Sequence, residues 1–383
     1  MKTILYFHQS AELYGSDKTL LQLVIGMSLA GHEVIVVVPN EGLLTQEFKK
    51  NNIRYIVSPV LKLTRDMFTF RKMFLSFLDI FSSIKKIRKE TKNLKIDFIH
   101  SNTLAVLNGA IYAKLFHIQH IWHIHEIIEK PKIVKKIFKF LINSFSDIVV
   151  FNSNATAIHW GIKNDKISYN IIYNGSNNFE ISLSADEINV LRKKFLDTER
   201  QSIIITLVGR ISRFKGQQLL LKAFELACKD KTDCHLVFVG NSPSGQEHYQ
   251  NDLEKMVNGS QKKDFIHILP YQKNIDEVYT ISDIIVVPST EPESFGMVAL
   301  EAMAAERAVI VAGHGGILEI IDHNKTGIIF EPSNLEDLAR SLNELIENKQ
   351  LRERLGKAAR EKAKEFSLGK YLDSFEKLYS TEK

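Results

Sequence analysis

The sequence contains few cysteines. Only 2 of its 383 residues are cysteines, and these two, Cys228 and Cys234, lie too far apart for a CxxC redox or metal motif. Two cysteines do not make the disulfide framework that is typical of small secreted domains. This scarcity favours a reducing compartment.

Long hydrophobic runs are also missing. A membrane-spanning helix needs about 20 apolar residues, whereas the longest candidate, Met73–Phe81, is short and contains Asp79. Met1 and Lys2 precede a short apolar run that His8 interrupts before any sequence resembling a signal cleavage site. We therefore expect no signal peptide and no membrane span. The expected location is the cytoplasm, either in solution or peripherally on the inner face of the membrane.

Charge is distributed unevenly along the chain. The net charge is +5, but residues 1–175 hold 23 Lys and Arg against 13 Asp and Glu, whereas residues 176–383 hold 27 against 32. The first half is therefore basic and the second half mildly acidic. We expect the two halves to meet different partners.

Apolar runs of strand length alternate with helical patterns throughout the chain. In the first half the expected strands are Thr3–Phe7, Glu33–Pro39, Arg54–Ser58, Phe98–Ser101, His120–His125 and Ile148–Asn152. In the second half they are Ile203–Gly209, His235–Gly240, Ile266–Leu269, Ile284–Pro288, Ala308–Ala312 and Gly327–Phe330. β-branched strands separated by helices are typical of parallel sheets covered on both faces. Because twelve strands in one sheet would be unusual, the sequence predicts an α/β protein of two Rossmann-like, doubly wound domains.

The domain boundary is expected between Gly175 and Ser202, where an Asn-Gly turn leads into a polar stretch. The predicted domains are residues 1–180 and 181–365. Residues 366–383 show apolar side chains at helical spacing and are predicted to form a last helix.

The segment Thr290–Ala302 (TEPESFGMVALEA) is the most informative part of the sequence. It follows a predicted buried strand and leads into a helix that should begin near Gly296. A helix N-terminus after a sharp turn binds phosphate, because unpaired N–H groups and the helix dipole converge there. Glu293 and Glu301 flank the turn and would repel phosphate, but they suit hydroxyl groups such as those of sugars. The alternative is an ordinary loop carboxylate and a helix charge that the dipole favours. The combination favours a nucleotide-sugar site.

A second candidate lies in Leu207–Gly216 (LVGRISRFKG), where a strand ends and a loop carries two cations. Open α/β sheets bind ligands at the carboxyl ends of their strands. Arg210 and Lys215 would neutralise a diphosphate there, the arginine as a planar fork and the lysine as a point charge. The alternative reading is two solvated surface cations. Because the motif with Glu293 and Glu301 accompanies these cations, we favour the interpretation that they bind a diphosphate.

Taken together, these motifs resemble the retaining glycosyltransferases of family 4, whose mark is two glutamates separated by seven residues. The resemblance continues through four more segments, Glu301–Ala304, Ala308–Ile310, Gly315–Ile321 and Thr326–Pro332. It covers residues 203–332 well and the first half more weakly. The family has the GT-B fold, in which two Rossmann-like domains face each other across a cleft. The resemblance therefore implies this fold, with the acceptor on the first domain, the donor on the second and the last helix crossing back to the first.

The resemblance also implies roles for individual residues of the second domain. Glu293 would hold hydroxyls of the donor sugar and act in catalysis, and Glu301 would accept from the ribose hydroxyls. The backbone N–H groups of Phe295, Gly296, Met297 and Val298 would meet the distal phosphate, and Arg210 and Lys215 match the diphosphate-binding pair. The sequence has no Asp-x-Asp pair, the usual metal handle of the other main glycosyltransferase fold. We expect neither a metal nor a cofactor, because cations and a helix dipole can stabilise a departing diphosphate.

In the first half, the loop Gln9–Lys18 follows the first strand, and Gly15 is expected to approach the donor closely. The family often has two adjacent glycines here, but this sequence has Tyr14 before Gly15, and a plain strand–helix turn is the alternative. His125 matches a histidine that the family places beside the reacting sugar, where it could bind a hydroxyl or steady developing charge. His123 lies on the same strand face, but no third metal ligand is evident, so a structural role is expected for it.

Two basic segments suggest contact with a membrane. Residues 61–95 contain ten Lys and Arg against three Asp and Glu, interleaved with aromatic and Met side chains. Residues 132–145 place Lys132, Lys135, Lys136 and Lys139 on one helical stripe and apolar residues on another. Such helices lie on anionic membrane surfaces. Core-packed helices with a solvated basic face are the alternative, and no recognised nucleic-acid-binding module accompanies the charge.

The sequence thus predicts a metal-independent, retaining glycosyltransferase. Its donor would be a nucleoside diphosphate sugar and its acceptor a glycan or lipid-linked saccharide. Surface polysaccharide assembly (O-antigen, capsule or lipopolysaccharide) is the expected setting. The alternatives are another GT-B enzyme, such as a sugar-nucleotide epimerase or a phosphorylase, and a non-catalytic protein that binds sugar nucleotides or membranes.

Overall fold

The computed structural model describes residues 1–383 apart from 61–69, 163, 165–166, 178–183, 197–201 and 381–383. The side chains of residues 70–78 and 185 also lie outside the description. The chain forms two compact units. One consists of Met1–Gly175 together with Leu368–Lys383, and the other of Ser176–Ser367.

The first unit is built on a parallel sheet of seven strands in the order β3-β2-β1-β4-β5-β6-β7. The strands are β1 Thr3–His8, β2 Glu33–Val38, β3 Arg54–Val57, β4 Phe98–Asn102, β5 Gln119–Ile124, β6 Ile148–Phe151 and β7 Ser168–Ile171. Apolar side chains point to both faces of the central strands, because helices cover both faces. The order reverses between β1 and β4, which makes that point the switch point of the sheet.

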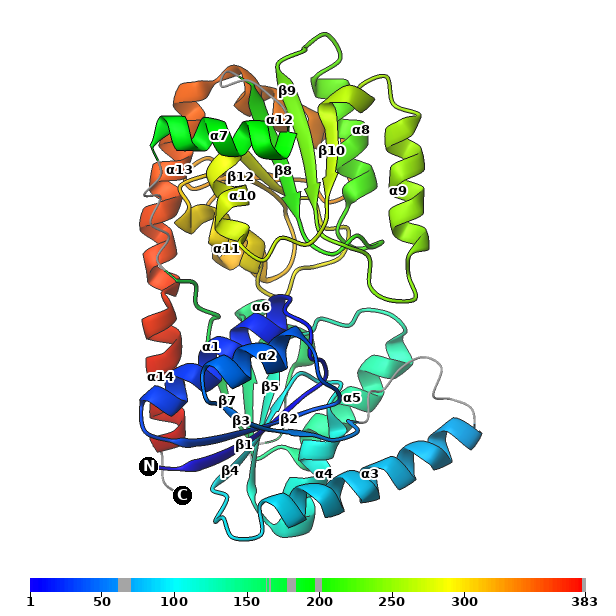
Figure 1. Cartoon of the computed structure of the whole chain (residues 1–383), viewed down its shortest axis with the longest axis vertical. Coiled ribbons are helices and arrows are strands. Elements are labelled where there is room, and N and C mark those ends of the chain that lie inside the picture. The colour runs from blue at the N-terminus through cyan, green and yellow to red at the C-terminus, as the bar shows by residue number, and fades with distance from the viewer. Residues whose placement is uncertain (61–69, 163, 165–166, 178–183, 197–201, 381–383) are drawn as a thin grey trace. The chain divides into compact units, whose positions relative to one another are not determined.

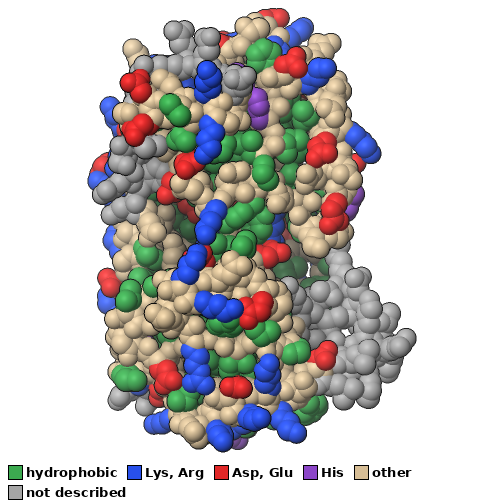
Figure 2. All heavy atoms as spheres, in the orientation of Figure 1, with side chains coloured by type: hydrophobic (Ala, Val, Ile, Leu, Met, Phe, Trp, Pro, Cys, Tyr) green, Lys and Arg blue, Asp and Glu red, His purple; other side chains and the backbone are tan. Residues whose placement is uncertain are grey.

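Helices α1, α2 and α14 pack on one face of this sheet, and α3, α4, α5 and α6 pack on the other (Figure 1). Their bounds are α1 Gly15–Leu29, α2 Leu43–Lys50, α3 Phe70–Glu90, α4 Leu107–Phe116, α5 Lys132–Phe145, α6 Asn154–Trp160 and α14 Leu368–Ser380. On the face of the first unit shown in Figure 2, Lys and Arg side chains lie among acidic and apolar ones. Among the described residues on that face, the basic excess of the first half therefore forms no single patch.

The last helix, α14, completes the core of the first unit. Tyr371, Phe375, Leu378 and Tyr379 are buried in the same cluster as residues of β1, β2 and α1. The hydroxyl of Tyr379 lies 3.0 Å from the hydroxyl of Tyr6 and 2.6 Å from Nδ1 of His100. The helix thus contributes both apolar surface and hydrogen bonds to the centre of the sheet.

The second unit contains a parallel sheet of six strands in the order β10-β9-β8-β11-β12-β13. The strands are β8 Ile203–Val208, β9 Cys234–Val239, β10 Ile266–Leu269, β11 Ile284–Val287, β12 Ala308–Ala312 and β13 Ile328–Phe330. The helices are α7 Ala185–Leu196, α8 Gln217–Ala227, α9 His248–Asn258, α10 Ile275–Ile281, α11 Met297–Ala304, α12 Leu335–Glu347 and α13 Lys349–Ala363, with short 3-10 turns η2 Lys263–Phe265, η3 Gly316–Glu319 and η4 Lys364–Phe366. Helices α8, α9 and α12 bury one face of the sheet, and α7 and α10 pack on the other.

The predicted α/β fold with two Rossmann-like sheets is confirmed, and the predicted strands appear at the expected places. The sequence did not predict β7 or α7. Strand β7, Ser168–Ile171, lies at an edge of the sheet and carries polar or exposed side chains, so it lacks the apolar run of a buried strand. Helix α7 lies in the stretch that its polar composition marked as a linker.

Among the described residues, no helix is both long and apolar enough to cross a membrane.

Candidate functional site

The site in the second unit is set by the topology of its sheet. Strand order reverses between β8 and β11, so the chain leaves these two neighbouring strands in opposite directions across the sheet. Such a switch point leaves a crevice at the carboxyl ends of the strands, where open α/β sheets bind ligands. The loops at this point are residues 209–216 and 288–296, which carry most of the predicted donor-binding residues.

These two loops are fastened to each other. The backbone N–H of Thr290 donates to the carbonyl oxygen of Phe214 over 2.8 Å. Gly216 has a positive φ of 77°, and a Cβ at this position would lie 2.1 Å from the carbonyl oxygen of Pro288. Glycine is required here both for the backbone conformation and for the close approach. The loop with Arg210 and Lys215 is therefore held at a fixed distance from the loop with Glu293.

Lys215 and Glu293, predicted from separate motifs, meet in the structure. Lys215 Nζ lies 2.7 Å from Glu293 Oε1, and the two side chains are 31% and 18% exposed. The Ser289 hydroxyl donates to the same oxygen over 2.5 Å. Burial pushes the pKa of Glu293 upward, but the charge of Lys215 and these hydrogen bonds outweigh it and hold the pKa below its ordinary value. The site thus keeps a carboxylate beside a cation.

The backbone of Glu293 is fixed as well. Its carbonyl oxygen accepts the N–H of Gly316 over 2.7 Å, in an isolated β-bridge between Glu293 and Gly315. Gly315 has a φ of 81°, and a Cβ there would lie 2.2 Å from the same carbonyl oxygen. The loop after β12 therefore supports the loop after β11 from the side opposite to Lys215's strand β8.

Helix α11 begins where the sequence predicted. Gly296 is its N-cap with a φ of 102°, and the N–H of Leu300 donates to the Gly296 carbonyl oxygen over 3.0 Å. The geometry of a first helical turn leaves the amides of Met297 and Val298 without a carbonyl in their own helix. Phe295 is buried beneath the turn. The N-terminus of α11 thus presents backbone donors at the switch point, the arrangement that binds a phosphate.

Glu301 lies on the same helix and is held by a tyrosine. Tyr279 of α10 is fully buried, and its hydroxyl donates to Glu301 Oε2 over 2.6 Å. Burial and the nearby Glu301 raise the pKa of Tyr279 well above its ordinary value, so the phenol keeps its proton. No sequence pattern pointed to Tyr279.

Arg210 lies two residues after the end of β8 and is half-buried. Its carbonyl oxygen accepts a hydrogen bond of 2.9 Å from Nε2 of Gln217, the buried first residue of α8. Gln217 therefore ties the start of this loop to the helix at its end. His314 also reaches the neighbouring loop, with Nε2 2.8 Å from the carbonyl oxygen of Ser289.

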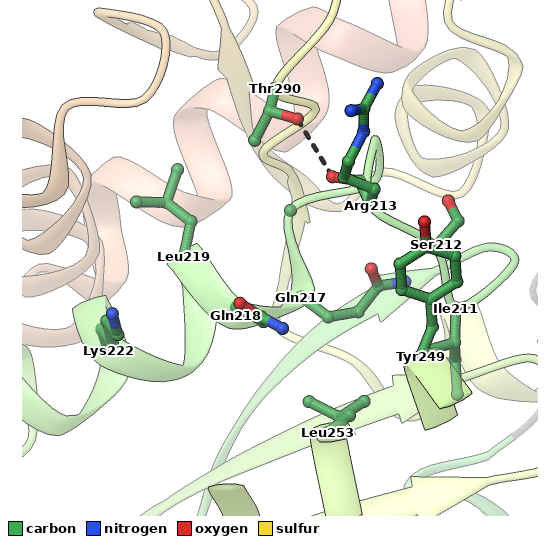
Figure 3. Close-up of a pocket in the computed structure, with 11 residues that line it drawn as sticks. Ile211, Ser212, Arg213, Gln217, Gln218, Leu219, Lys222, Tyr249, Leu253 and Thr290 are labelled. Carbon is green, nitrogen blue, oxygen red and sulfur yellow. Dashed lines mark hydrogen bonds between the residues drawn. The ribbon is translucent and has the colours of Figure 1, made fainter. Parts of the chain in front are cut away.

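A cavity of about 290 Å³ adjoins the loop between β8 and α8 (Figure 3). Among its lining residues are Ser212, Arg213, Gln217, Gln218, Tyr249 and Thr290. It shares part of the loop with the predicted donor site, but Arg210, Lys215 and the two glutamates do not line it. The cavity is therefore distinct from the cluster around Glu293.

In the first unit, polar side chains gather at the carboxyl ends of β1 and β4, which flank the switch point. His8 and Asn102 are register partners, and both are fully buried. His8 Nε2 lies 2.6 Å from Asp17 Oδ1, and Asp17 also accepts hydrogen bonds from the Ser10 hydroxyl and the Tyr14 backbone N–H. Burial pushes the pKa of Asp17 upward, but the hydrogen bond and charge of His8, with the other donors, hold it below its ordinary value.

Asn102 connects this pair to His125. Its Nδ2 lies 3.1 Å from His8 Nδ1, and its Oδ1 lies 2.9 Å from His125 Nε2. Because the amide nitrogen donates and the amide oxygen accepts, His125 carries its proton on Nε2. Burial and the nearby His8 lower the pKa of His125 to about 3, so its imidazole is neutral at ordinary pH. The hydrogen bond to Asn102 therefore fixes the tautomer of His125.

The pKa of Glu126, the next residue, is shifted upward, not downward. Its carboxylate accepts the backbone N–H groups of Leu104 and His125 at 3.0–3.3 Å. Burial raises the pKa of Glu126 to about 7, although these hydrogen bonds act to lower it. The residue secures the loop after β5 to the loop after β4.

The remaining predictions for the first unit concern Gly15 and His123. Gly15 is the first residue of α1, and a Cβ there would meet no atom within 4 Å, so the space beside it is open to a ligand. His123 is fully buried between His100, His125 and Phe375, and neither of its ring nitrogens has a hydrogen-bond partner among the described residues. In the part of the chain that the structure describes, no group of three or more His, Cys, Asp or Glu side chains could hold a metal ion.

Several residues of these two clusters were not singled out from the sequence: Ser289, Tyr279, His8, Asp17 and Asn102. His8 and Asn102 could have been found, because both are polar residues that end an apolar strand beside the switch point. No such signal marks Tyr279, which lies within a helix 22 residues before its partner.

Comparisons with known proteins match both units. Residues 190–362 match the family described as glycosyl transferases group 1, and residues 14–177 match glycosyltransferase family 4. An uncharacterised glycosyltransferase of Methanocaldococcus jannaschii is 30% identical over 295 residues, which are 74% of this chain and 75% of that protein. Spore coat protein SA of Bacillus subtilis is 34% identical over 164 residues, or 42% of this chain, and the match spans only 44% of that protein's length.

A solved structure extends the comparison to the whole chain. HepE of Anabaena, crystallised in complexes with UDP and glucose and with UDP-glucose, has a TM-score of 0.86 with a coverage of 100% of both chains. Its sequence identity is 22%. At that identity the likeness shows a shared fold.

Proposed function

The chain belongs to the group 1 glycosyltransferases of the GT-B fold, and we propose that it transfers a sugar from a nucleoside diphosphate sugar with retention of anomeric configuration. The observation that carries this proposal is the pairing of Lys215 with Glu293 beside the N-terminus of α11. That pairing puts a cation, a carboxylate and helix-terminal N–H groups at one switch point. HepE, with the same fold, binds UDP-glucose, which supports a nucleotide sugar as donor.

The groups at the switch point of the second unit's sheet could bind the phosphates, the sugar and the ribose of such a donor. The amides of Met297 and Val298 would receive the distal phosphate, and Lys215 and Arg210 would add positive charge. Glu293 would accept from hydroxyls of the sugar, and Glu301 from hydroxyls of the ribose. In this proposal the departing diphosphate is stabilised by these groups and the helix dipole, not by a metal ion.

The proposed reaction passes through an oxocarbenium-like state as the diphosphate leaves. The acceptor then attacks from the face that the diphosphate has vacated, which preserves the configuration. His125 would bind a sugar hydroxyl, because its neutral imidazole has a tautomer fixed by Asn102. The proposal assigns no covalent nucleophile.

A thermal-shift panel of UDP-, GDP- and CMP-sugars tests the donor site. A ligand at about a hundred times its Kd adds roughly 2.7 kcal/mol of stability, which raises the midpoint of unfolding by several degrees. We expect one class of nucleotide sugar to give this shift with the wild-type protein. Arg210→Ala and Glu301→Ala should remove most of it, because each loses a direct contact with the donor.

The matched control for this panel is Arg213→Ala, which removes an exposed arginine of the same loop that pairs with Glu291. It should respond to the ligand as the wild type does, since exposed ion pairs contribute little. If no nucleotide sugar stabilises the wild-type protein, or if all three variants respond equally, the donor-site assignment is wrong.

The acceptor is proposed to be a glycan or a lipid-linked saccharide of surface polysaccharide assembly, reached at an anionic membrane surface. Part of the predicted membrane-facing segment 61–95, residues 61–69, lies outside the described residues. Helix α5 is described, and Phe138 and Ile142 anchor it in the core. Ile133, Ile137 and Phe140 are 59%, 37% and 67% exposed beside its lysines. Apolar side chains flanked by cations suit a surface of anionic lipid headgroups.

Sedimentation with lipid vesicles tests this surface. We expect the protein to bind vesicles rich in the anionic lipid phosphatidylglycerol and to bind pure phosphatidylcholine weakly. A lysine near an anionic surface is worth about 1 kcal/mol. Replacing four lysines by glutamine should therefore reduce binding by more than about a hundredfold; these are Lys132, Lys135, Lys136 and Lys139.

The control replaces four exposed lysines of the second unit: Lys229, Lys255, Lys263 and Lys325. It removes the same charge and should leave vesicle binding within about threefold of the wild type. Equal losses in the two variants would show that net charge, not α5, governs the attraction. Absence of binding by the wild type at low salt would remove the membrane from the proposal.

A further inference from the structure

The hydrogen bond between Tyr279 and Glu301 joins two neighbouring helices of the second unit. Tyr279 lies in α10, has no exposed surface, and donates from its hydroxyl to Glu301 Oε2 over 2.6 Å. Its neighbours Val278 and Ile281 are buried in the core that α10 forms with the sheet. The phenolic oxygen is therefore a fixed point at the edge of the site.

The direction of this hydrogen bond is also fixed. Burial and the nearby Glu301 keep the proton on the phenol, so Tyr279 is the donor and the carboxylate the acceptor. Glu301 is half-buried and is the fifth residue of α11, which begins at Met297. A glutamate carries three side-chain torsions, and the last, which turns the carboxylate plane, is soft. A buried phenol on one oxygen restricts that torsion.

We propose that Tyr279 is a positioning residue that sets the carboxylate plane of Glu301 and thereby the preference of the site for ribose over deoxyribose nucleotides. The inference rests on the proposed function, in which Glu301 faces the ribose. The two cis hydroxyls of a ribose are donors in one plane, and a carboxylate accepts both only when its own plane matches. A carboxylate that turns freely binds the two hydroxyls less tightly, because each binding event must first restrict it to the matching orientation.

The test is the affinity ratio between a ribonucleotide and its deoxy analogues. Titration calorimetry would give the Kd of UDP, 2′-deoxy-UDP and 3′-deoxy-UDP for wild-type protein and Tyr279→Phe. For the wild type we expect each missing hydroxyl to weaken binding about tenfold, the usual loss of a hydrogen bond to a charged group. For Tyr279→Phe we expect the ratio to fall to about threefold or less, with little change in the Kd of the deoxy analogues.

A second tyrosine provides the control. Tyr112 is buried in the first unit, where its hydroxyl lies 3.3 Å from the Thr91 hydroxyl. Tyr112→Phe removes one buried phenolic hydroxyl, as Tyr279→Phe does, but far along the chain from Glu301. It should leave the ratio at the wild-type value. Because each ratio compares two ligands on one protein, a loss of stability that affects both ligands equally cancels.

The outcomes separate the inference from the proposed function. An unchanged or larger ratio in Tyr279→Phe, with normal discrimination by the wild type, overturns the positioning role and leaves the donor site intact. Equal binding of UDP and its deoxy analogues by the wild type overturns the assignment of Glu301 to the ribose, and the inference with it. If neither UDP nor GDP binds the wild type, the proposed function itself fails. A reduced ratio in Tyr279→Phe alone supports the inference.

Discussion

Replacing Lys215 by methionine is expected to weaken the binding of the nucleoside diphosphate about fiftyfold and to slow sugar transfer about a thousandfold. Methionine keeps the unbranched side chain up to the ε-carbon and removes the ammonium group with its charge. In the structure that charge lies 2.7 Å from Glu293 Oε1. The loss should be larger in transfer than in binding, because negative charge on the diphosphate grows as the sugar departs. Calorimetry with UDP or GDP measures the first effect, and release of the diphosphate measures the second.

The same substitution should change the pH dependence of the reaction. In the wild-type protein the pKa of Glu293 is held down, mainly by Lys215, against the upward effect of burial. The stabilising effect of the pair is therefore present above the ordinary pKa of a glutamate and is lost as the pH falls through the lower, folded-state value. Without Lys215, burial raises the pKa of Glu293. The acid limb of the pH–rate profile should then move to higher pH.

Arg213→Met is the control for this experiment. Arg213 lies two residues away, is exposed, and pairs with the exposed Glu291 at 3.1 Å. Removing such a surface pair should change transfer by less than about threefold. The interpretation of Lys215 would be wrong if both variants lost activity equally, or if Lys215→Met retained more than about a tenth of the wild-type rate.

Gly315→Ala should destabilise the protein by about 3 kcal/mol and should greatly weaken donor binding. Gly315 has a φ of 81°, which side chains rarely adopt, and a Cβ there would lie 2.2 Å from the carbonyl oxygen of Glu293. The obstructing atom is a backbone oxygen, which cannot rotate away as the end of a side chain could. The Glu293 loop must then shift, which breaks the 2.7 Å hydrogen bond from the Gly316 N–H and moves the carboxylate from Lys215. Thermal unfolding should show a midpoint lower by about 8 °C.

A substitution at Gly245 separates the cost of the backbone conformation from the cost of the steric clash. It has nearly the same φ, 79°, but a Cβ there would meet no atom within 4 Å. Gly245→Ala should therefore show only the backbone cost of about 1 kcal/mol and should bind the nucleotide normally. If the two variants were equally stable and equally active, the contact between Gly315 and Glu293 would have no effect on the site.

Most of the fold followed from local patterns. Buried parallel strands such as β8 and β11 are continuous apolar runs, which the sequence shows directly. Strand β7 was missed because an edge strand needs hydrogen bonds on one side only and carries polar side chains. Helix α7 was missed for a related reason, since a short charged helix resembles a linker until its packing against α10 is known.

The parts of the candidate site that could be predicted are those built from residues close together in the sequence, around a turn. Gly296 and the glutamates on either side of it are close in sequence, and the helix start followed from them. The meeting of Lys215 with Glu293 required the strand order, because 78 residues separate them. Tyr279 could not be found in this way. Tertiary packing brings it to Glu301, and no local sequence pattern distinguishes this buried tyrosine from one that only fills the core.

The return of α14 to the first unit makes that unit discontinuous along the chain. Synthesis proceeds from the N-terminus, so the second unit is made before the helix that supplies Phe375 and Tyr379 to the first. Until then Tyr6 and His100 lack the hydroxyl that pairs with both, and an unpaired buried polar group is costly. The second unit can fold as one continuous segment as it emerges. The first unit stays incomplete until α14 has been made. During synthesis, therefore, the N-terminal part of the chain is the part most exposed to aggregation and proteolysis.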